Sequence, residues 1–258
     1  MRHLTYWTHA TMAGDNTLDL IQSHVSVRDF TGQPVDLETL HRLIACGQSA
    51  ATSSFIQAYS IVRVTDPAKR AAIAAAAGGQ QWVIAAPEFL VLCADLNRLN
   101  IATEKAGQGA LDGQTEHSIA AVIDVALMAQ NMLLAAESLG MGGVFIGGIR
   151  NDPAVTIDQL QLPHRVMPLF GLCLGYPAHK NPVKPRMPVT HVLHTDSFDA
   201  SRVAGDVDDY DAVLNEYYQS RGAGSKNANW SDSVAPALQG KKRQHMLSVM
   251  TARGFFNA

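Results

Sequence analysis

The chain has few cysteines, few aromatic residues and no marked surplus of charge of either sign. Its three cysteines, Cys46, Cys93 and Cys173, are odd in number and widely spaced in apolar surroundings. This pattern indicates neither a disulfide framework nor a zinc site, and it favours buried thiols in a reducing cytosol. The formal net charge of −3 excludes the broad basic surface of a nucleic-acid or anionic-membrane binder, so any basic site is local.

A long uninterrupted apolar segment is also lacking. The run over 118–136 is broken by Asp124, Gln130 and Asn131, and a membrane span with these breaks is costly. A buried helix is therefore expected there. The N-terminus has no continuous apolar stretch of the kind found in signal peptides, so we expect a flexible leader over 1–15 and a cytoplasmic protein.

The usual catalytic motifs are missing. There is no G-x-S-x-G, no P-loop and no G-x-G-x-x-G after a predicted strand. The pair His191 and His194 has no obvious third ligand, so no metal site is expected. No catalytic side chain is predicted either, and an enzyme with this sequence would take its reactivity from a bound cofactor.

The sequence does contain the elements of one substantial core, because 47% of its 258 residues are hydrophobic. Four short apolar segments predict strands, near 60–64, at 87–95, between the glycine pairs of 140–150, and at 167–174. They alternate with helical patterns too irregularly for a Rossmann array, which favours an α+β fold with a mixed central β-sheet flanked by helices. We expect a single domain over 1–258, with a core at 16–195 and a C-terminal extension at 196–258.

Four polar clusters lie among these elements. They are His24, Ser26 and Arg28 on alternate residues; Thr52, Ser53 and Ser54 in a turn; Gly147 and Gly148 after a strand; and Lys184 and Arg186 between prolines. Each has an ordinary structural explanation: a solvated strand face, a capping turn, hairpin glycines, a basic loop. Together they offer cations and hydroxyls for a phosphate and open backbone for a flat ring. That combination indicates an anionic planar cofactor.

Several blocks in one order carry a family resemblance: "HVSVRDFTGQPV", "ATSSFIQ", "AAAGGQQWV", "MAQNMLLAAESLGMGGVFIGGIR", "MPLFGLCLGYP" and "NPVKPRMP". From Ser23 to Asp232 the chain resembles the oxygen-insensitive NADPH nitroreductases and the related NADPH-flavin oxidoreductases. The resemblance implies an intertwined homodimer with FMN in each of two interface clefts. It also implies that the C-terminal extension lies on the NADPH and substrate side and wraps the dimer.

The resemblance assigns roles to the polar clusters. His24 and Ser26 would lie by the FMN phosphate, and Arg28 by N1 and the C2 carbonyl of the flavin, where a cation favours the reduced form. The turn Thr52–Ser54 would follow the ribityl chain and ring. The remaining cofactor contacts would be Gln80 at the ring, Phe145, Ile146, Gly147 and Gly148 near N5, and Lys184 and Arg186 at the phosphate.

Two positions depart from the family pattern. Val25 stands where the family has an arginine, so one contact to phosphate or ring is lost. In the tail, Arg221 and Lys226 match a segment that contacts the 2′-phosphate of NADPH, but Asn227 replaces its second arginine. Arg243 matches an arginine near the substrate. A solvated basic patch is the alternative for these tail residues.

The implied activity is a ping-pong, two-electron reduction of nitroaromatics and quinones. NADPH passes a hydride to flavin N5 and leaves, and the acceptor then takes the electrons at the same face. A flavin reductase that supplies reduced FMN to a partner enzyme is an alternative, and a flavin-binding protein without turnover is another. The expected partners are small molecules and a second copy of the chain, with neither nucleic acid nor membrane.

Overall fold

The computed structural model describes residues 11–179, 181–221, 227–240 and 243–257. The chain divides into two compact units. The first comprises residues 1–181 together with 244–258, and the second comprises residues 182–243. The first unit contains the sheet and is described before the second.

The sheet has four strands, in the order β1-β2-β4-β3. They are β1 (Tyr59–Arg63), β2 (Glu88–Asp95), β3 (Gly142–Ile146) and β4 (Val166–Gly175). Every residue of β2 is buried, as its continuous apolar run predicts. The α+β class and the four strands are confirmed. All three strand pairings described are antiparallel, so the mixed pairing expected from the sequence is not seen among the described strands.

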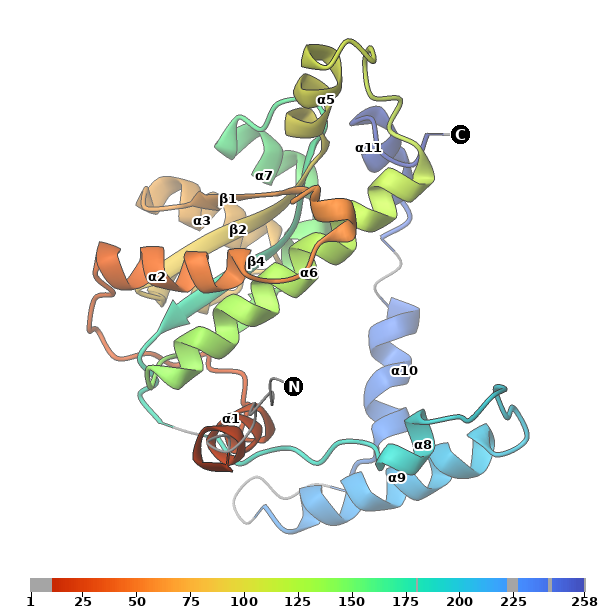
Figure 1. The fold of residues 1–258 in the computed structure, drawn as a ribbon. Helices are drawn as coiled ribbons and strands as arrows, with labels where there is room; N and C mark the ends of the chain where they lie inside the picture. The colour runs from red at the N-terminus through yellow and green to blue at the C-terminus, as the bar shows by residue number, and fades with distance from the viewer. Residues whose placement is uncertain (1–10, 180, 222–226, 241–242, 258) are drawn as a thin grey trace, which may run out of the picture. The chain divides into compact units, whose positions relative to one another are not determined.

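Helices cover both faces of the sheet (Figure 1). On one face α2 packs with α6, and the opposite face is covered by α3, α4 and α7. The helical elements of this unit are α1 (Thr11–Gln22), α2 (Leu37–Gln48), η1 (Ser53–Phe55), α3 (Pro67–Ala76), α4 (Gln81–Ala85), α5 (Leu96–Lys105), α6 (Thr115–Ser138), η2 (Gly147–Asn151), α7 (Pro153–Leu160) and α11 (Met246–Ala252). The helix α3 has Asp66 as its N-cap and Pro67 in its first turn, which explains where it begins.

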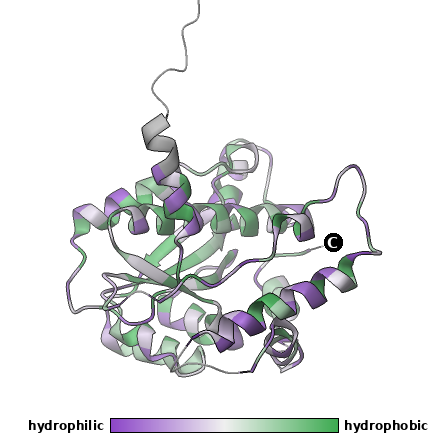
Figure 2. Cartoon of the chain, turned by 90° about the horizontal axis from the view of Figure 1, so that it is seen from below, coloured by the Kyte–Doolittle hydropathy of each residue, from purple (hydrophilic) through white to green (hydrophobic). Residues whose placement is uncertain are grey.

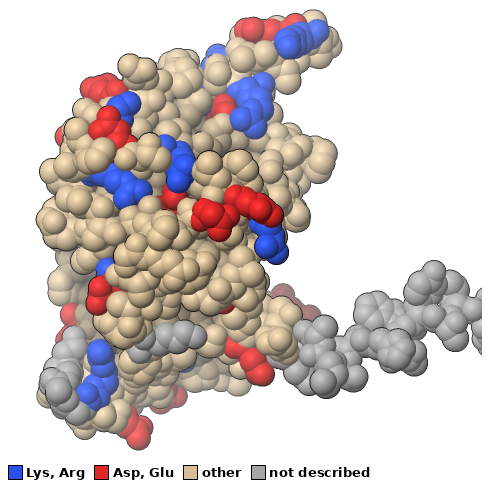
Figure 3. All heavy atoms as spheres, turned by 90° about the vertical axis from the view of Figure 1, so that its left-hand side faces the viewer, with Lys and Arg blue, Asp and Glu red and all other residues tan. Residues whose placement is uncertain are grey.

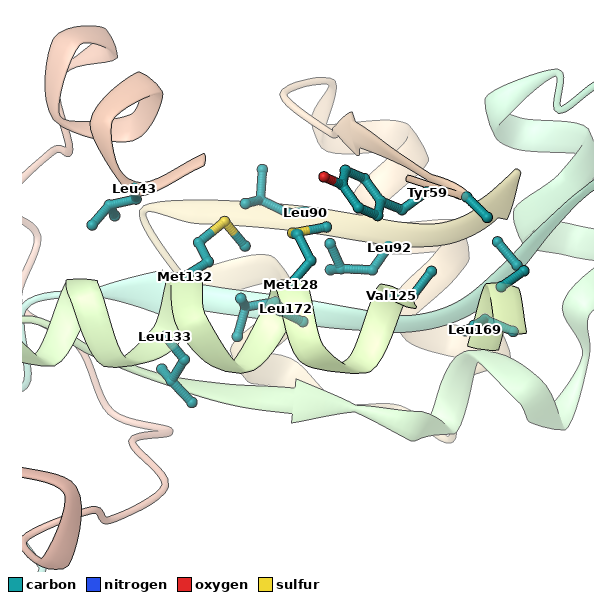
Figure 4. Close-up of a cluster of buried hydrophobic side chains, with 14 of the residues drawn as sticks. Leu43, Tyr59, Leu90, Leu92, Val125, Met128, Met132, Leu133, Leu169 and Leu172 are labelled. Atoms are coloured by element: carbon teal, nitrogen blue, oxygen red, sulfur yellow. The ribbon is translucent and has the colours of Figure 1, made fainter. Parts of the chain in front are cut away.

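The 24-residue helix α6 is the centre of the larger core. Val125, Met128 and Met132 point from α6 toward Leu90 and Leu92 on β2 (Figure 4). By length and composition α6 is apolar enough to cross a membrane, but half of its most apolar window is buried inside the structure. The helix therefore packs as the core helix that the sequence predicts. In Figure 2, green marks hydrophobic residues and is concentrated on this helix and on the sheet.

The last residues of the chain belong to the first unit. Phe255 is fully buried in the core around α6. The Arg165 N–H donates to the Arg253 carbonyl at 3.0 Å, and the Asn257 N–H donates to the Gly113 carbonyl at 3.1 Å. Residues 182–243 are therefore an insertion whose two ends both continue into the first unit.

The second unit contains α8 (Val189–Val192), α9 (Val203–Gln219) and α10 (Trp230–Gly240). Tyr210, Leu214 and Tyr218 on α9 form a small core of their own, against which Met187 and Trp230 pack. This cluster is separate from the cores beside the sheet, and the second unit begins at residue 182. The single domain with a C-terminal extension from residue 196 stays a prediction.

Some local expectations differ from the structure. Helix α1 covers Thr11–Gln22 and so overlaps the expected leader of residues 1–15. The polar stretch after β2 contains α5, which is capped by the Asp95 carboxylate at the Arg98 N–H; a short helix with loops is one of the two arrangements that its sequence suggests, the other being a loop. Cys46 is exposed on α2, whereas Cys93 and Cys173 are buried as predicted.

Candidate functional site

One group of predicted site residues is joined through an indole ring. The Arg28 guanidinium lies 5.8 Å from the centre of the Trp82 ring. Trp82 Nε1 donates to Gln80 Oε1 at 3.0 Å, and Gln80 Nε2 donates to the Ala77 carbonyl at 2.9 Å. Among the described residues no carboxylate pairs with Arg28, and its guanidinium lies against the indole ring. The structure thus brings Arg28 and Gln80 together.

Gly148 completes this group. A Cβ atom placed on Gly148 would lie 2.4 Å from both the Ala77 carbonyl oxygen and Gln80 Nε2. Such contacts are too short for any side chain, so only glycine lets this backbone lie against Gln80. Gly148 is buried, whereas Gly147 is partly exposed. Open backbone for a ligand at this glycine pair stays a prediction.

An open hollow lies beside the same glycines, with a volume of about 360 Å³. Phe145 and Gly147 line it, and Phe145 meets Phe170 edge-to-face with ring centres 5.3 Å apart. Ala126, Gln130 and Arg150 complete the lining. Ile146 is fully buried and packs in the core on the other side of the strand, so it does not line the hollow.

The turn at Thr52–Ser54 is fixed from α6. Asp124 accepts hydrogen bonds from the Ser53 N–H at 3.0 Å and from the Ala58 N–H at 3.1 Å. Ser53 and Ser54 are exposed, while the Thr52 hydroxyl is buried without a hydrogen-bond partner among the described residues. An unpartnered buried hydroxyl is costly, and a ligand in this turn would offer it a partner.

The opening stretch packs along β3 and the end of α6. His24 Nδ1 lies 2.6 Å from Glu137 Oε1, and the Val27 N–H donates to the Gly143 carbonyl at 2.9 Å. His24 and Ser26 are half-buried, whereas Arg28 is exposed. Alternate residues therefore do not share one solvated face, because Glu137 holds the imidazole of His24.

The proline-flanked cations belong to the second unit. Lys184 Nζ lies 5.1 Å from the centre of the Tyr218 ring, and the Tyr210 hydroxyl donates to the Pro185 carbonyl at 2.9 Å. These contacts fix the segment to α9, and Arg186 is exposed beside it.

The tail cations are in the same unit. The Arg221 guanidinium lies 5.8 Å from the Tyr217 ring centre. Arg243 is half-buried at the end of the unit, and Lys226 lies outside the described residues. His191 lies 3.7 Å from Asp206, but the described residues contain no group of three side chains that could hold a metal ion.

The arrangement in the first unit fits FMN. It offers an exposed guanidinium that has no carboxylate partner in the described part of the chain, an open hollow lined by Gly147, and a buried hydroxyl that needs a partner. Sequence reasoning missed Trp82, Gln130, Arg150 and Phe170. All four lie inside blocks that carry the family resemblance: Trp82 in "AAAGGQQWV", Gln130 and Arg150 in "MAQNMLLAAESLGMGGVFIGGIR", and Phe170 in "MPLFGLCLGYP". Their place in those blocks is the signal that could have indicated them.

Comparison with known proteins gives consistent results over both units. The model of the Nitroreductase family matches residues 21–176, and that of the Nitroreductase family, C-terminal domain, matches residues 184–258. The oxygen-insensitive NADPH nitroreductase of Salmonella typhimurium is 42% identical over 93% of this chain and 98% of its own length. The NADPH-flavin oxidoreductase of Vibrio harveyi is 41% identical over the same shares of the two chains.

A solved structure shows the same fold. The NfrA1 nitroreductase of Bacillus subtilis superposes with a TM-score of 0.89 at 37% identity, covering 93% of this chain and 99% of its own. Sequence blocks, fold and two family matches agree along nearly the whole chain. This protein therefore belongs to the nitroreductase family.

Proposed function

We propose that this protein binds FMN and uses NADPH to reduce nitroaromatic compounds and quinones by two electrons. The observation that carries the proposal is the group formed by Arg28, Trp82, Gln80 and Gly148. The neighbour of Gly148 in sequence, Gly147, lines an open hollow. The relatives named as an NADPH nitroreductase and an NADPH-flavin oxidoreductase support both the cofactor and the reductant.

FMN, when bound, supplies the redox chemistry, since it takes two electrons from NADPH and gives them to an acceptor. The residues of this chain bind it and tune it. Arg28 places a fixed positive charge where negative charge develops on reduction, which favours the reduced form. Gln80 and the backbone of Phe145–Gly148 contact the ring, and the hollow beside Phe145 and Gly147 receives the nicotinamide or the acceptor.

Other residues hold the charged and hydroxylated parts. Lys184 and Arg186 offset the phosphate charge, the role of His24 and Ser26 is also at the phosphate, and Thr52–Ser54 contact the ribityl chain. Arg221 and Lys226 bind the 2′-phosphate of NADPH, and Arg243 contacts the substrate. The loss of an arginine at Val25 leaves one contact fewer on the phosphate side than the family pattern has.

The site is completed in a cytoplasmic homodimer. Ile119, Ile123 and Leu127 follow one another on successive turns of α6 and are 43%, 50% and 45% exposed. Three large apolar side chains on one exposed helix face favour burial against another surface. A second copy of the chain is the partner that we propose for this face. On the face of the molecule in Figure 3, acidic and basic residues are interspersed.

The absorption spectrum of the purified protein tests the cofactor. We expect a yellow protein whose flavin bleaches under anaerobic conditions on addition of NADPH, more slowly with NADH, and returns to yellow when nitrofurazone is added. A colourless protein that takes up no added FMN would refute the proposal. A flavin that stays yellow with either nucleotide would indicate a binding protein without turnover.

A second candidate function is the supply of reduced FMN to a partner enzyme. The similarity to a Vibrio harveyi protein named NADPH-flavin oxidoreductase favours this candidate. The two functions differ in the acceptor. Steady turnover of added free FMN at a rate above that of nitrofurazone, with bound flavin in rapid exchange, would favour the flavin reductase. A bound flavin that exchanges slowly would favour the nitroreductase.

A further inference from the structure

A carboxylate lies in the interior of α6 and faces a distant turn. Asp124 has no exposed surface. Its Oδ1 accepts the Ser53 N–H and its Oδ2 accepts the Ala58 N–H, at 3.0 and 3.1 Å. A buried carboxylate is costly unless it is paired, and here the partners are two backbone amides from outside the helix.

The turn between these two amides has an unfavourable backbone. Ser54, Phe55 and Gln57 have φ angles of 45°, 60° and 51°, in the left-handed region that side chains other than glycine disfavour. Residues in such conformations persist when the surrounding contacts hold them there. The two bonds to Asp124 hold the turn at its first and last residues. The Phe55 side chain, which is 79% exposed, is at its tip.

The surroundings of Asp124 are closed to solvent on the side of the sheet. Tyr59, the residue after Ala58, is the first residue of β1. Its hydroxyl is buried without a hydrogen-bond partner among the described residues. Burial, and after it the negative charge of Asp124, raises the pKa of Tyr59 above its ordinary value. No cation of the described chain forms an ion pair with Asp124, so the two amides are the partners that stabilise its charge.

We infer that Asp124 is a positioning residue of the flavin site. By binding both ends of the turn it places the hydroxyls of Thr52–Ser54 and the ring of Phe55 where the cofactor and the acceptor meet them. This inference rests on the proposed contact between this turn and FMN. Asp124 itself touches neither cofactor nor substrate, and it acts through the backbone of the turn.

The test compares two buried polar residues of the same helix. Asp124→Asn keeps the size of the side chain but replaces an accepting oxygen with an amide group, so one N–H loses its acceptor. Ser118→Ala is the matched control, because the fully buried Ser118 Oγ accepts the Phe256 N–H at 2.8 Å, far from the turn in sequence. Both variants lower the melting temperature. Only Asp124→Asn raises the FMN Kd, by about tenfold or more, and changes the visible circular dichroism of the bound flavin.

The outcomes separate this inference from the proposed function. An Asp124→Asn protein that binds FMN as tightly as the unaltered protein overturns the positioning role, as does an equal loss in Ser118→Ala. If the unaltered protein takes up no FMN, the proposed function itself is wrong.

A measurement on the unaltered protein covers the case in which Asp124→Asn does not fold. In the FMN-free protein, the Ser53 and Ala58 amides should exchange their hydrogens as slowly as amides of the sheet. Exchange at the rate of exposed turns would also overturn the positioning role.

Discussion

At the scale of single residues, Arg28 acts through its charge. Arg28→Ala removes the cation from the reduced flavin and should lower the flavin midpoint potential by about 30–60 mV. Arg98→Ala is the control, since Arg98 is 61% exposed, pairs with the buried Asp95 at 3.6 Å and is not among the predicted cofactor contacts. Potentials are measured by equilibrium titration against reference dyes. An unchanged potential in Arg28→Ala would contradict the role given to this guanidinium.

Gly148 acts through its missing side chain. Gly148→Ala places a methyl group 2.4 Å from the Ala77 carbonyl oxygen and should destabilise the protein by about 1–3 kcal/mol while weakening FMN binding. Gly205→Ala, in α9 with no atom near the added methyl, should stabilise it by about 0.5–1 kcal/mol. Urea unfolding of the two variants gives both values. Equal stability for the two would show that the backbone near Gly148 relaxes freely.

At the scale of elements, two neighbouring strands each carry a protected thiol. Burial raises the pKa of Cys93 on β2 and of Cys173 on β4 to about 12. Both therefore stay protonated at pH 8, whereas Cys46 is exposed on α2. A disulfide reagent at pH 8 should modify one thiol per native chain and three after denaturation. Cys46→Ala should abolish the native reaction, and modification of a second thiol without denaturation would count against the burial of these strands.

The pairing of β1 with β2 also includes an ion pair. Arg63 Nε and Nη2 donate to the buried Glu88 carboxylate at 2.8 and 2.6 Å. Arg63→Ala leaves that carboxylate without its fork-like partner and should cost about 2 kcal/mol, because Arg63 itself is partly exposed. Adding Glu88→Gln should recover part of the loss, since the neutral amide is cheaper to bury. Chemical unfolding of the single and double variants checks this, and a double variant no more stable than Arg63→Ala would refute it.

At the scale of the whole molecule, the exposed face of α6 predicts the oligomeric state. Ile123→Glu puts a charge at the centre of this face and should shift the protein from dimer to monomer with loss of bound FMN. Ile101→Glu is the control, because Ile101 is 44% exposed on α5, away from α6's apolar face in sequence. Light scattering after size exclusion measures the mass. A monomeric unaltered protein that holds FMN would place the site within one chain.

How much of this the sequence predicts depends on the range of the contacts. The strands β2 and β4 and the helix α3 follow from local signals, a continuous apolar run or a proline after a capping aspartate. Helix α5 does not follow from a local signal, because its polar composition is also typical of a loop. Its buried Leu96 gains its contacts only in the folded core.

The site shows the same limit. The family blocks indicate Arg28, Gln80 and Gly148, but they do not reveal the Trp82 ring between the first two. In the sequence, Asp124 is recognisable only as a polar residue that interrupts an apolar run. Its partners Ser53 and Ala58 are 71 and 66 positions away, and no local pattern predicts such a pairing. The glutamate that holds His24 is likewise 113 positions distant.

The return of the C-terminal residues to the first unit has a consequence for biosynthesis. Phe255 fills the core beside the sheet, so that core cannot close until nearly the whole chain has left the ribosome. Translation adds roughly 5–20 residues per second, so the last contacts of this core form only after the entire insertion has been synthesised. The second unit, which has its own small aromatic cluster, is completely synthesised before the first unit is. The unit that begins first in the sequence is therefore the last to be completed.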